Sequence, residues 1–318
     1  MLLEHFKVTG IAVFQIFILA AAGYLLVRRR FLSSEGLDSL SKLAMDVTLP
    51  MLIFCQLIRD FSFTAYPGWW LFPLLSLLVT AAGLTIGYLF SLLVKGEQHK
   101  RQFIGLVGFQ NSGWLPLVLA ASLFSGQELA AMFIYIFLFL TGFNLVMFSV
   151  GVHILSFHKE MKFNWLNLMS APVVVTLISL AMVFFGLNRF VPEAVLKPLK
   201  MLGDSTLPLA MLVVGGNLAE ISLRNIDKKA MSLLICAKML ILPAIGVALL
   251  LLFKMPYLVG LLMMMQLTAP SAVTISVILR AYKKEDLLAS QGILFTHLAA
   301  IITIPLFLIL YFSGIMLK

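Results

Sequence analysis

The chain has 318 residues, of which 61% are hydrophobic and only 12% are charged. Soluble domains carry about 25% charged residues, so this composition excludes a protein whose whole surface faces water. The formal net charge is +9. Because the basic residues lie in short segments between apolar runs, they indicate membrane topology rather than nucleic-acid binding. Cys55 and Cys236 lie in separate apolar runs, which favours neither a disulfide framework nor a metal site.

The apolar runs predict an all-α membrane protein with ten transmembrane helices, because a helix needs about 20 apolar residues to cross the bilayer core. In chain order the predicted spans are 8–27, 38–58, 68–94, 102–124, 128–152, 168–186, 194–218, 229–253, 256–279 and 287–313. No stretch remains for a soluble domain. The first run is interpreted as an uncleaved helix, because its strong basic cluster, Arg28 to Arg30, follows the run instead of preceding it.

Basic residues concentrate in alternate connections, after the first, third, fifth, seventh and ninth spans. They are Arg28, Arg29, Arg30, Lys95, Lys100, Arg101, Lys159, Lys162, Arg224, Lys228, Lys229, Arg280, Lys283 and Lys284. The positive-inside rule assigns these connections to the cytoplasm and both termini to the outside. For a chain with such short loops, we expect a bacterial inner membrane as the location.

Two internal matches predict a repeat. Residues 46–50 read Asp-Val-Thr-Leu-Pro and residues 204–208 read Asp-Ser-Thr-Leu-Pro. Pro116 and Pro270 form a second pair at nearly the same offset. These offsets pair a first repeat, residues 1–155, with a second, residues 165–318. Because each holds five spans, the second runs upside down relative to the first, as in many secondary transporters.

The fourth and ninth spans carry the candidate site. Residues 108–116 read Gly-Phe-Gln-Asn-Ser-Gly-Trp-Leu-Pro, and residues 266–271 read Gln-Leu-Thr-Ala-Pro-Ser. Such segments break a helix, and the freed backbone groups must face a protein cavity or a ligand rather than lipid. The predicted substrate-binding residues are Gln110, Asn111, Ser112, Gly113, Pro116, Gln266, Thr268, Ala269, Pro270 and Ser271. Half-helix amino ends favour an anion there; simple proline kinks are the alternative.

Polar groups at membrane depth are the other candidates, for ion coupling or internal pairing. They are Asp46, Asn144, Asp204, Lys238 and His297. The two aspartates are equivalent in the repeat and are candidates for helix caps as well. For Lys238 we expect an internal partner, either a carboxylate or backbone carbonyls. His297 fits a proton carrier or a hydrogen-bonded packing residue equally, and Asn144 favours bonding between helices.

Sequence motifs for enzymes are missing. The chain contains no Gly-rich phosphate loop, no His-Glu-x-x-His and no Gly-x-Ser-x-Gly motif. We therefore expect neither nucleotide-driven transport nor hydrolysis, and no cofactor or bound metal.

In order and spacing, these motifs resemble the auxin efflux carrier family, which includes plant auxin carriers and bacterial permeases for malate, malonate and similar acids. The resemblance covers essentially the whole chain. It is carried by residues 48–50, 108–116, 207–210 with 215–216, Lys238 with Pro243, and 269–272. Two features depart from the family pattern: Trp114 stands where a smaller apolar residue is usual, and the third span has no acidic residue or lysine for proton coupling.

The resemblance implies ten helices in two inverted halves. Helices one, two, six and seven would form a scaffold, often dimeric, that includes Asp46 and Asp204. Helices three to five and eight to ten would form a moving transport unit, with Asn111, Pro116 and Pro270 where helices four and nine cross. The expected function is elevator-like secondary transport of a small organic anion, with protons or sodium as candidate coupling ions and a homodimer as the expected assembly. A sodium-coupled symporter of the bile-acid type and a passive channel are the alternatives.

Overall fold

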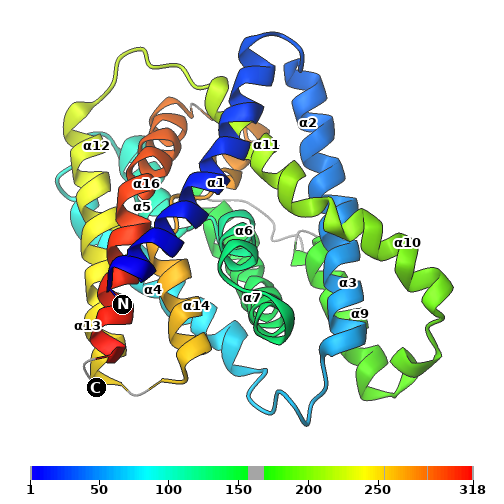
Figure 1. Ribbon diagram of the computed structural model, residues 1–318. Coiled ribbons are helices and arrows are strands. Elements are labelled where there is room, and N and C mark those ends of the chain that lie inside the picture. The colour runs from blue at the N-terminus through cyan, green and yellow to red at the C-terminus, as the bar shows by residue number, and fades with distance from the viewer. Residues whose placement is uncertain (1, 157–167, 254, 285, 317–318) are drawn as a thin grey trace.

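The computed structural model describes residues 2–156, 168–253, 255–284 and 286–316, and these residues are almost entirely helical (Figure 1). The α-helices are α1 (Leu2–Arg28), α2 (Ser34–Leu43), α3 (Leu49–Asp60), α4 (Leu71–Ser91), α5 (Glu97–Gly108), α6 (Trp114–Leu123), α7 (Gly126–Val146), α8 (Val152–Ser156), α9 (Ala171–Phe184), α10 (Glu193–Asp204), α11 (Thr206–Ala219), α12 (Lys228–Leu234), α13 (Leu242–Leu252), α14 (Tyr257–Thr268), α15 (Thr274–Ala281) and α16 (Leu287–Met316). The all-α prediction is confirmed.

Seven continuous helical runs of the described chain are long and apolar enough to cross a membrane. Each of the seven overlaps a predicted span. The fourth and ninth predicted spans are instead divided, into α5 and α6 and into α14 and α15. The sixth is α9, whose 14 residues are fewer than the 168–186 span predicted.

Wide turns interrupt three of the long runs without ending them. These π-helical turns are Ala44–Thr48 between α2 and α3, Met147–Gly151 between α7 and α8, and Ile235–Ile241 between α12 and α13. Pro50 and Pro243 each take the second position of the helix that follows. A proline there has no amide hydrogen to give to the preceding turn, which gives a local reason for the irregular backbone.

Glycines allow two helix pairs to approach closely. Helix α1 crosses α11 (Figure 1), and a Cβ atom on Gly215 would lie only 1.7 Å from the Ala20 carbonyl oxygen. On α4, Gly83 and Gly87 face α5 in the same way, with added Cβ atoms 3.0 Å from backbone atoms of α5. Small residues four apart are a common means of packing membrane helices, and here they fix the position of the last turn of α5.

The helices form two packing groups. Helix α1 packs on α11, and α3 packs on both α9 and α10. In the other group α4 contacts α5 and α7, while α16 contacts α13 and α14. Helix α1 also contacts α6 and α16, α7 contacts α3 and α9, and α6 contacts α11, so the two groups pack against each other over several helix pairs.

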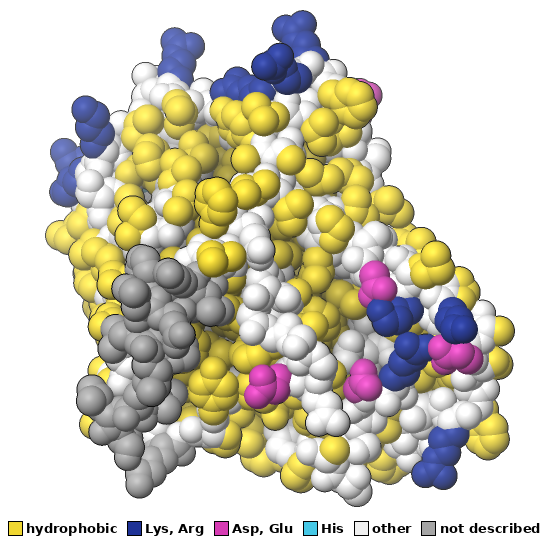
Figure 2. All heavy atoms as spheres, in the orientation of Figure 1, with side chains coloured by type: hydrophobic (Ala, Val, Ile, Leu, Met, Phe, Trp, Pro, Cys, Tyr) yellow, Lys and Arg dark blue, Asp and Glu magenta, His cyan; other side chains and the backbone are white. Residues whose placement is uncertain are grey.

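The outer surface is largely apolar, as Figure 2 shows for one face. Large side chains such as Phe14, Leu78 and Ile302 are about two-thirds exposed or more, which suits contact with lipid tails rather than water. Lysine and arginine side chains gather along the edge where α1 turns into α2. Lys159 and Lys162, which contribute to the predicted topology, lie outside the described residues.

Candidate functional site

The two broken helices meet at their breaks. Helix α5 ends at Gly108 and α6 begins at Trp114, while α14 ends at Thr268 and α15 begins at Thr274. Between them the chain is extended, and Gln110 pairs with Ser271 in an isolated antiparallel bridge. The sequence places these segments about 160 residues apart, and the fold brings them into direct backbone contact. We call this region the crossover.

Backbone and side-chain hydrogen bonds connect the two breaks. Asn111 N donates to the Pro270 carbonyl oxygen at 2.8 Å, and Ala272 N donates to the Phe109 carbonyl oxygen at 2.9 Å. Gln266 Nε2 donates to the Ser112 carbonyl oxygen at 3.1 Å. Backbone groups that the missing helical turn leaves without a partner at one break therefore form hydrogen bonds with groups at the other break.

Several buried polar atoms at the crossover have no hydrogen-bond partner among the residues that the structure describes. They are both amide atoms of Gln110, Asn111 Nδ2, Ser112 Oγ and Gln266 Oε1. Leaving a buried polar group unsatisfied costs about 1–3 kcal/mol. Such a concentration of open donors and acceptors is typical of a site that binds water or a polar ligand.

A small cavity of about 80 Å³ is lined by three of these four residues, all except Gln266. We call it the crossover cavity. Its walls include Gln110, Asn111, Ser112 and Gly113 from the first break and Ala272, Val273 and Thr274 from the second. Binding sites for drug-sized ligands are usually about 300–1,000 Å³, so the cavity as it stands accommodates only a small molecule.

Two helix amino ends border the crossover cavity. Helix α6 begins beside Gly113 and α15 begins beside Val273, and neither helix has a side-chain cap at that end. First-turn amide groups of a helix carry partial positive charge and have no partner within the helix itself. In α15, the Ile275 and Ser276 amides donate to the Ala272 and Val273 carbonyl oxygens just before the helix, both at 3.2 Å. The crossover cavity thus offers donors for a negatively charged group.

Comparison with known proteins identifies the family of the chain. The family model described as "Membrane transport protein" matches residues 9–308. The chain belongs to this membrane transport protein family, the auxin efflux carrier family. An uncharacterized transporter of Schizosaccharomyces pombe is 27% identical over 110 residues, which are 34% of this chain and 24% of the yeast protein. The match thus spans about a quarter of that relative. The family consists of transporters, and together with the long apolar helices it identifies an integral membrane protein.

The predicted substrate-binding residues divide into two sets. Gln110, Asn111, Ser112 and Gly113 line the crossover cavity. The remaining six do not line it: they are Pro116, Gln266, Thr268, Ala269, Pro270 and Ser271. Three of the six, Gln266, Pro270 and Ser271, form hydrogen bonds that join the two breaks. Ser271 Oγ donates to the Leu106 carbonyl oxygen at 2.7 Å, and Ser271 N donates to Thr296 Oγ1 at 3.2 Å.

Lys238 is fully buried and donates from Nζ to the Val107 carbonyl oxygen at 3.0 Å. Of the two partners expected for it, the structure provides the backbone carbonyl. His297 is also buried, with Nδ1 2.8 Å from the Ile293 carbonyl oxygen of its own helix and Nε2 without a partner in the described chain. This geometry is compatible with either role expected for His297.

The two repeat-related aspartates have different surroundings. Asp204 pairs with Lys200 Nζ at 2.7 Å, whereas Asp46 lies exposed in the first π-helical turn. The capping interpretation is wrong for both, because the residues at the amino ends of α3 and α11 are Thr48 and Ser205, with no side-chain cap. The reason is that α2 continues into α3 without a true helix start, and that Asp204 bonds back along α10.

Asn144 on α7 lines the crossover cavity. Its side chain forms no hydrogen bond to another helix within the described residues, so the expected interhelical bond is not found. It also borders an adjoining cavity of about 60 Å³ that is lined by Asp46 and Ser170. Met45, Phe143, Asn144, Pro172 and Thr274 line both cavities, which makes the two spaces neighbours.

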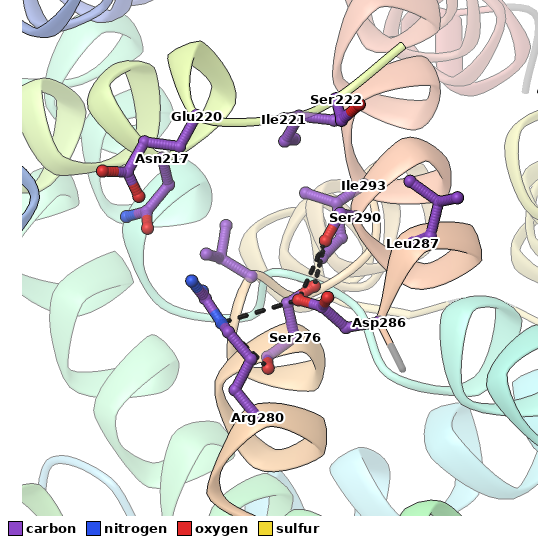
Figure 3. A pocket seen from close by; sticks show the side chains of 11 residues that line it. Asn217, Glu220, Ile221, Ser222, Ser276, Arg280, Asp286, Leu287, Ser290 and Ile293 are labelled. Atoms are coloured by element: carbon purple, nitrogen blue, oxygen red, sulfur yellow. Dashed lines mark hydrogen bonds and ion pairs between the residues drawn. The ribbon is translucent and has the colours of Figure 1, made fainter. Parts of the chain in front are cut away.

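Two larger pockets lie away from the crossover. One, of about 640 Å³, is lined by Arg59, Asp60, Lys200 and Asp204 on one side and by the start of α7 on the other. The second, of about 270 Å³, is shown in Figure 3. There Arg280 Nε lies 3.5 Å from Asp286 Oδ2, and Val273, which also lines the crossover cavity, forms part of the wall.

Sequence reasoning missed Gly83 and Gly87. Their spacing of four residues within an apolar span is a recognised signal for close helix packing. Because they set α4 against Ile104, Val107 and Gly108, they position the break of α5 without contacting the cavity.

Proposed function

We propose that this transporter is a secondary carrier that moves a small organic anion across the membrane by elevator-like alternating access. The observation that carries the proposal is the pair of broken helices with open buried polar atoms at their contact. Discontinuous helices that meet within the membrane are the usual substrate sites of such carriers. The uncapped amino ends of α6 and α15 favour an anion.

The proposed architecture is two inverted repeats, residues 1–155 and 165–318, with the crossover between their fourth and ninth helices. The two breaks occur at corresponding places, and the Asp46 and Asp204 pentapeptides both coincide with an irregular turn of a long helix. Residues 165–167 lie outside the described chain. We assign α1–α3 and α9–α11 to a scaffold and α4–α8 and α12–α16 to the transport unit, following the two packing groups.

For the assembly and location, we propose a homodimer through the scaffold in a bacterial inner membrane, with both termini outside. The basic edge near the α1–α2 turn (Figure 2) would then face the cytoplasm. The apolar exposed faces of the scaffold suit burial against a second copy or lipid. Crosslinking in native membranes tests the dimer.

The test of the carrier is uptake of radiolabelled small carboxylates by proteoliposomes. We expect Asn111→Ala and Pro270→Ala to lower uptake at least tenfold, because Asn111 Nδ2 is an open donor at the cavity and because alanine at position 270 restores an amide hydrogen and removes the ring that breaks the helix there. Thr141→Val is the matched control: Thr141 Oγ1 bonds to the Phe137 carbonyl of its own helix and the residue lies off the cavity. Normal uptake by both site variants would refute the site assignment.

Two further measurements separate the carrier from its alternatives. Counterflow, in which external unlabelled anion accelerates the movement of labelled internal anion, is expected of a carrier and not of a passive channel. Sodium-dependent uptake and sodium-dependent thermal stabilisation would identify a sodium symporter, whereas a pH gradient that drives uptake without sodium would identify proton coupling.

A further inference from the structure

The surroundings of the crossover cavity differ in charge from one end to the other. Among the described residues that line the crossover cavity there is no ionisable side chain; the polar side chains in its wall are amides, hydroxyls and the Trp114 indole. The adjoining cavity, by contrast, has the acidic residue Asp46 in its wall. A ligand that fills the crossover cavity and extends into its neighbour therefore approaches a negative charge.

Within the described chain, no basic side chain forms an ion pair with Asp46. Four ion pairs are formed among the described residues, and Asp46 takes part in none of them. Its repeat counterpart Asp204 is held by both of its oxygens at 2.7 Å from Lys200 Nζ. The two aspartates thus lie in similar pentapeptides, but within the described residues only the charge of Asp204 is compensated by an ion pair.

The position of Asn144 bears on how a substrate would be oriented in the two cavities. This residue lines both cavities: the crossover cavity together with Gly113 and Val273, and the adjoining cavity together with Asp46. A substrate carboxylate is stabilised at the helix amino ends. The remainder of the substrate then points past Asn144, whose amide both donates and accepts hydrogen bonds.

We propose that Asp46 is a specificity-determining residue that rejects a second carboxylate, so that the crossover selects monocarboxylates over dicarboxylates. This proposal rests on the anion carrier function proposed above. Like charges that lie close together repel each other, and a second carboxylate in the adjoining cavity would share that cavity with Asp46. A neutral tail, apolar or hydroxylated, avoids this repulsion and meets Asn144, Phe143 and Met45.

The test compares 3-hydroxybutyrate with malate, which replaces the methyl group of the former by a second carboxylate. Initial uptake of each radiolabelled anion is measured in proteoliposomes at pH 7.5. We expect wild type to prefer 3-hydroxybutyrate. Asp46→Asn, which removes the charge and keeps the shape, is expected to raise malate uptake relative to 3-hydroxybutyrate uptake about tenfold.

Two variants complete the design. Asp204→Asn is the matched control, because its charge is compensated by Lys200 and it lies outside both small cavities; we expect an unchanged ratio. Asp46→Glu restores the charge and is expected to keep the wild-type preference.

The proposal is overturned if wild type prefers malate, if Asp46→Asn leaves the ratio unchanged, or if Asp204→Asn shifts it equally. Those outcomes leave the carrier function intact as long as Asn111→Ala abolishes uptake. Absence of uptake of both anions by wild type would instead contradict the proposed function, and with it the role of Asp46.

Discussion

Replacing Gly215 by alanine tests the packing that holds α1 against α11. The added Cβ atom would lie 1.7 Å from the Ala20 carbonyl oxygen and 2.5 Å from its carbonyl carbon. Ordinary contacts of this kind are 3.4 Å or longer, so the two backbones must separate. Overpacking of a core costs about 1–3 kcal/mol and occasionally more. Because the obstacle is backbone on both sides, we expect the upper end of that range.

The higher helix preference of alanine offsets a small part of this loss of stability. Alanine favours a helix over glycine by about 1 kcal/mol, which leaves a net loss of about 2 kcal/mol. For a large domain this lowers Tm by roughly 2–4 °C per kcal/mol, or about 4–8 °C in total. Thermal unfolding of detergent-solubilised protein, followed by intrinsic fluorescence, measures this shift.

The matched control is Gly10→Ala in the same helix α1, because nothing lies within 4 Å of a Cβ atom at that position. This variant gains the helix preference without the clash, and its Tm is expected to equal or exceed that of wild type. If Gly215→Ala unfolds at the same temperature as Gly10→Ala, the close approach of α1 to α11 is wrong, and with it the geometry of the proposed scaffold.

Two other stability predictions follow from hydrogen bonds and charges. Thr296→Val removes the acceptor of the buried Ser271 amide and is expected to destabilise the protein by about 1–3 kcal/mol. Thr303→Val, where the lost bond is only to the Ala299 carbonyl of the same helix, should cost clearly less; equal losses would contradict the role of Thr296. Lys200→Met breaks an exposed pair with Asp204 and should change stability by no more than about 0.5 kcal/mol, so a large drop in the unfolding transition would contradict the weak contribution assigned to this pair.

The breaks themselves were predictable from sequence because their causes are local. Proline lacks an amide hydrogen and glycine relaxes the helix, and the polar residues between Gly108 and Pro116 cannot face lipid. The structure accordingly ends α5 at Gly108 and starts α6 at Trp114. Pro116 lies in the first turn of α6, where its missing amide hydrogen is of little consequence.

The residues that line the crossover cavity could not be predicted from sequence in the same way. Which side chain reaches a cavity depends on the rotation and tilt of helices that are distant in sequence. Met45 and Pro172 reach the crossover cavity although nothing in their own segments marks them. Conversely, Thr268 lies in a motif but bonds back to the Met264 carbonyl of its own helix, because a threonine in a helix commonly satisfies its hydroxyl this way.

The break in α5 also explains why a lysine is buried in another part of the chain. In a continuous helix, Asn111 N would donate to the Val107 carbonyl oxygen; here it donates to Pro270 instead. The Leu106 and Val107 carbonyls at the end of α5 are then open to other donors, and they accept bonds from Ser271 Oγ and Lys238 Nζ.

Both of these donors belong to the second half of the chain. The negative end of the α5 dipole favours a cationic donor, which gives a physical reason for Lys238 at this depth without a carboxylate partner. Each half of the molecule thus supplies the groups that the break in the other half requires, and neither break is satisfied by its own half alone. It follows that the crossover forms only when the two halves have folded against each other.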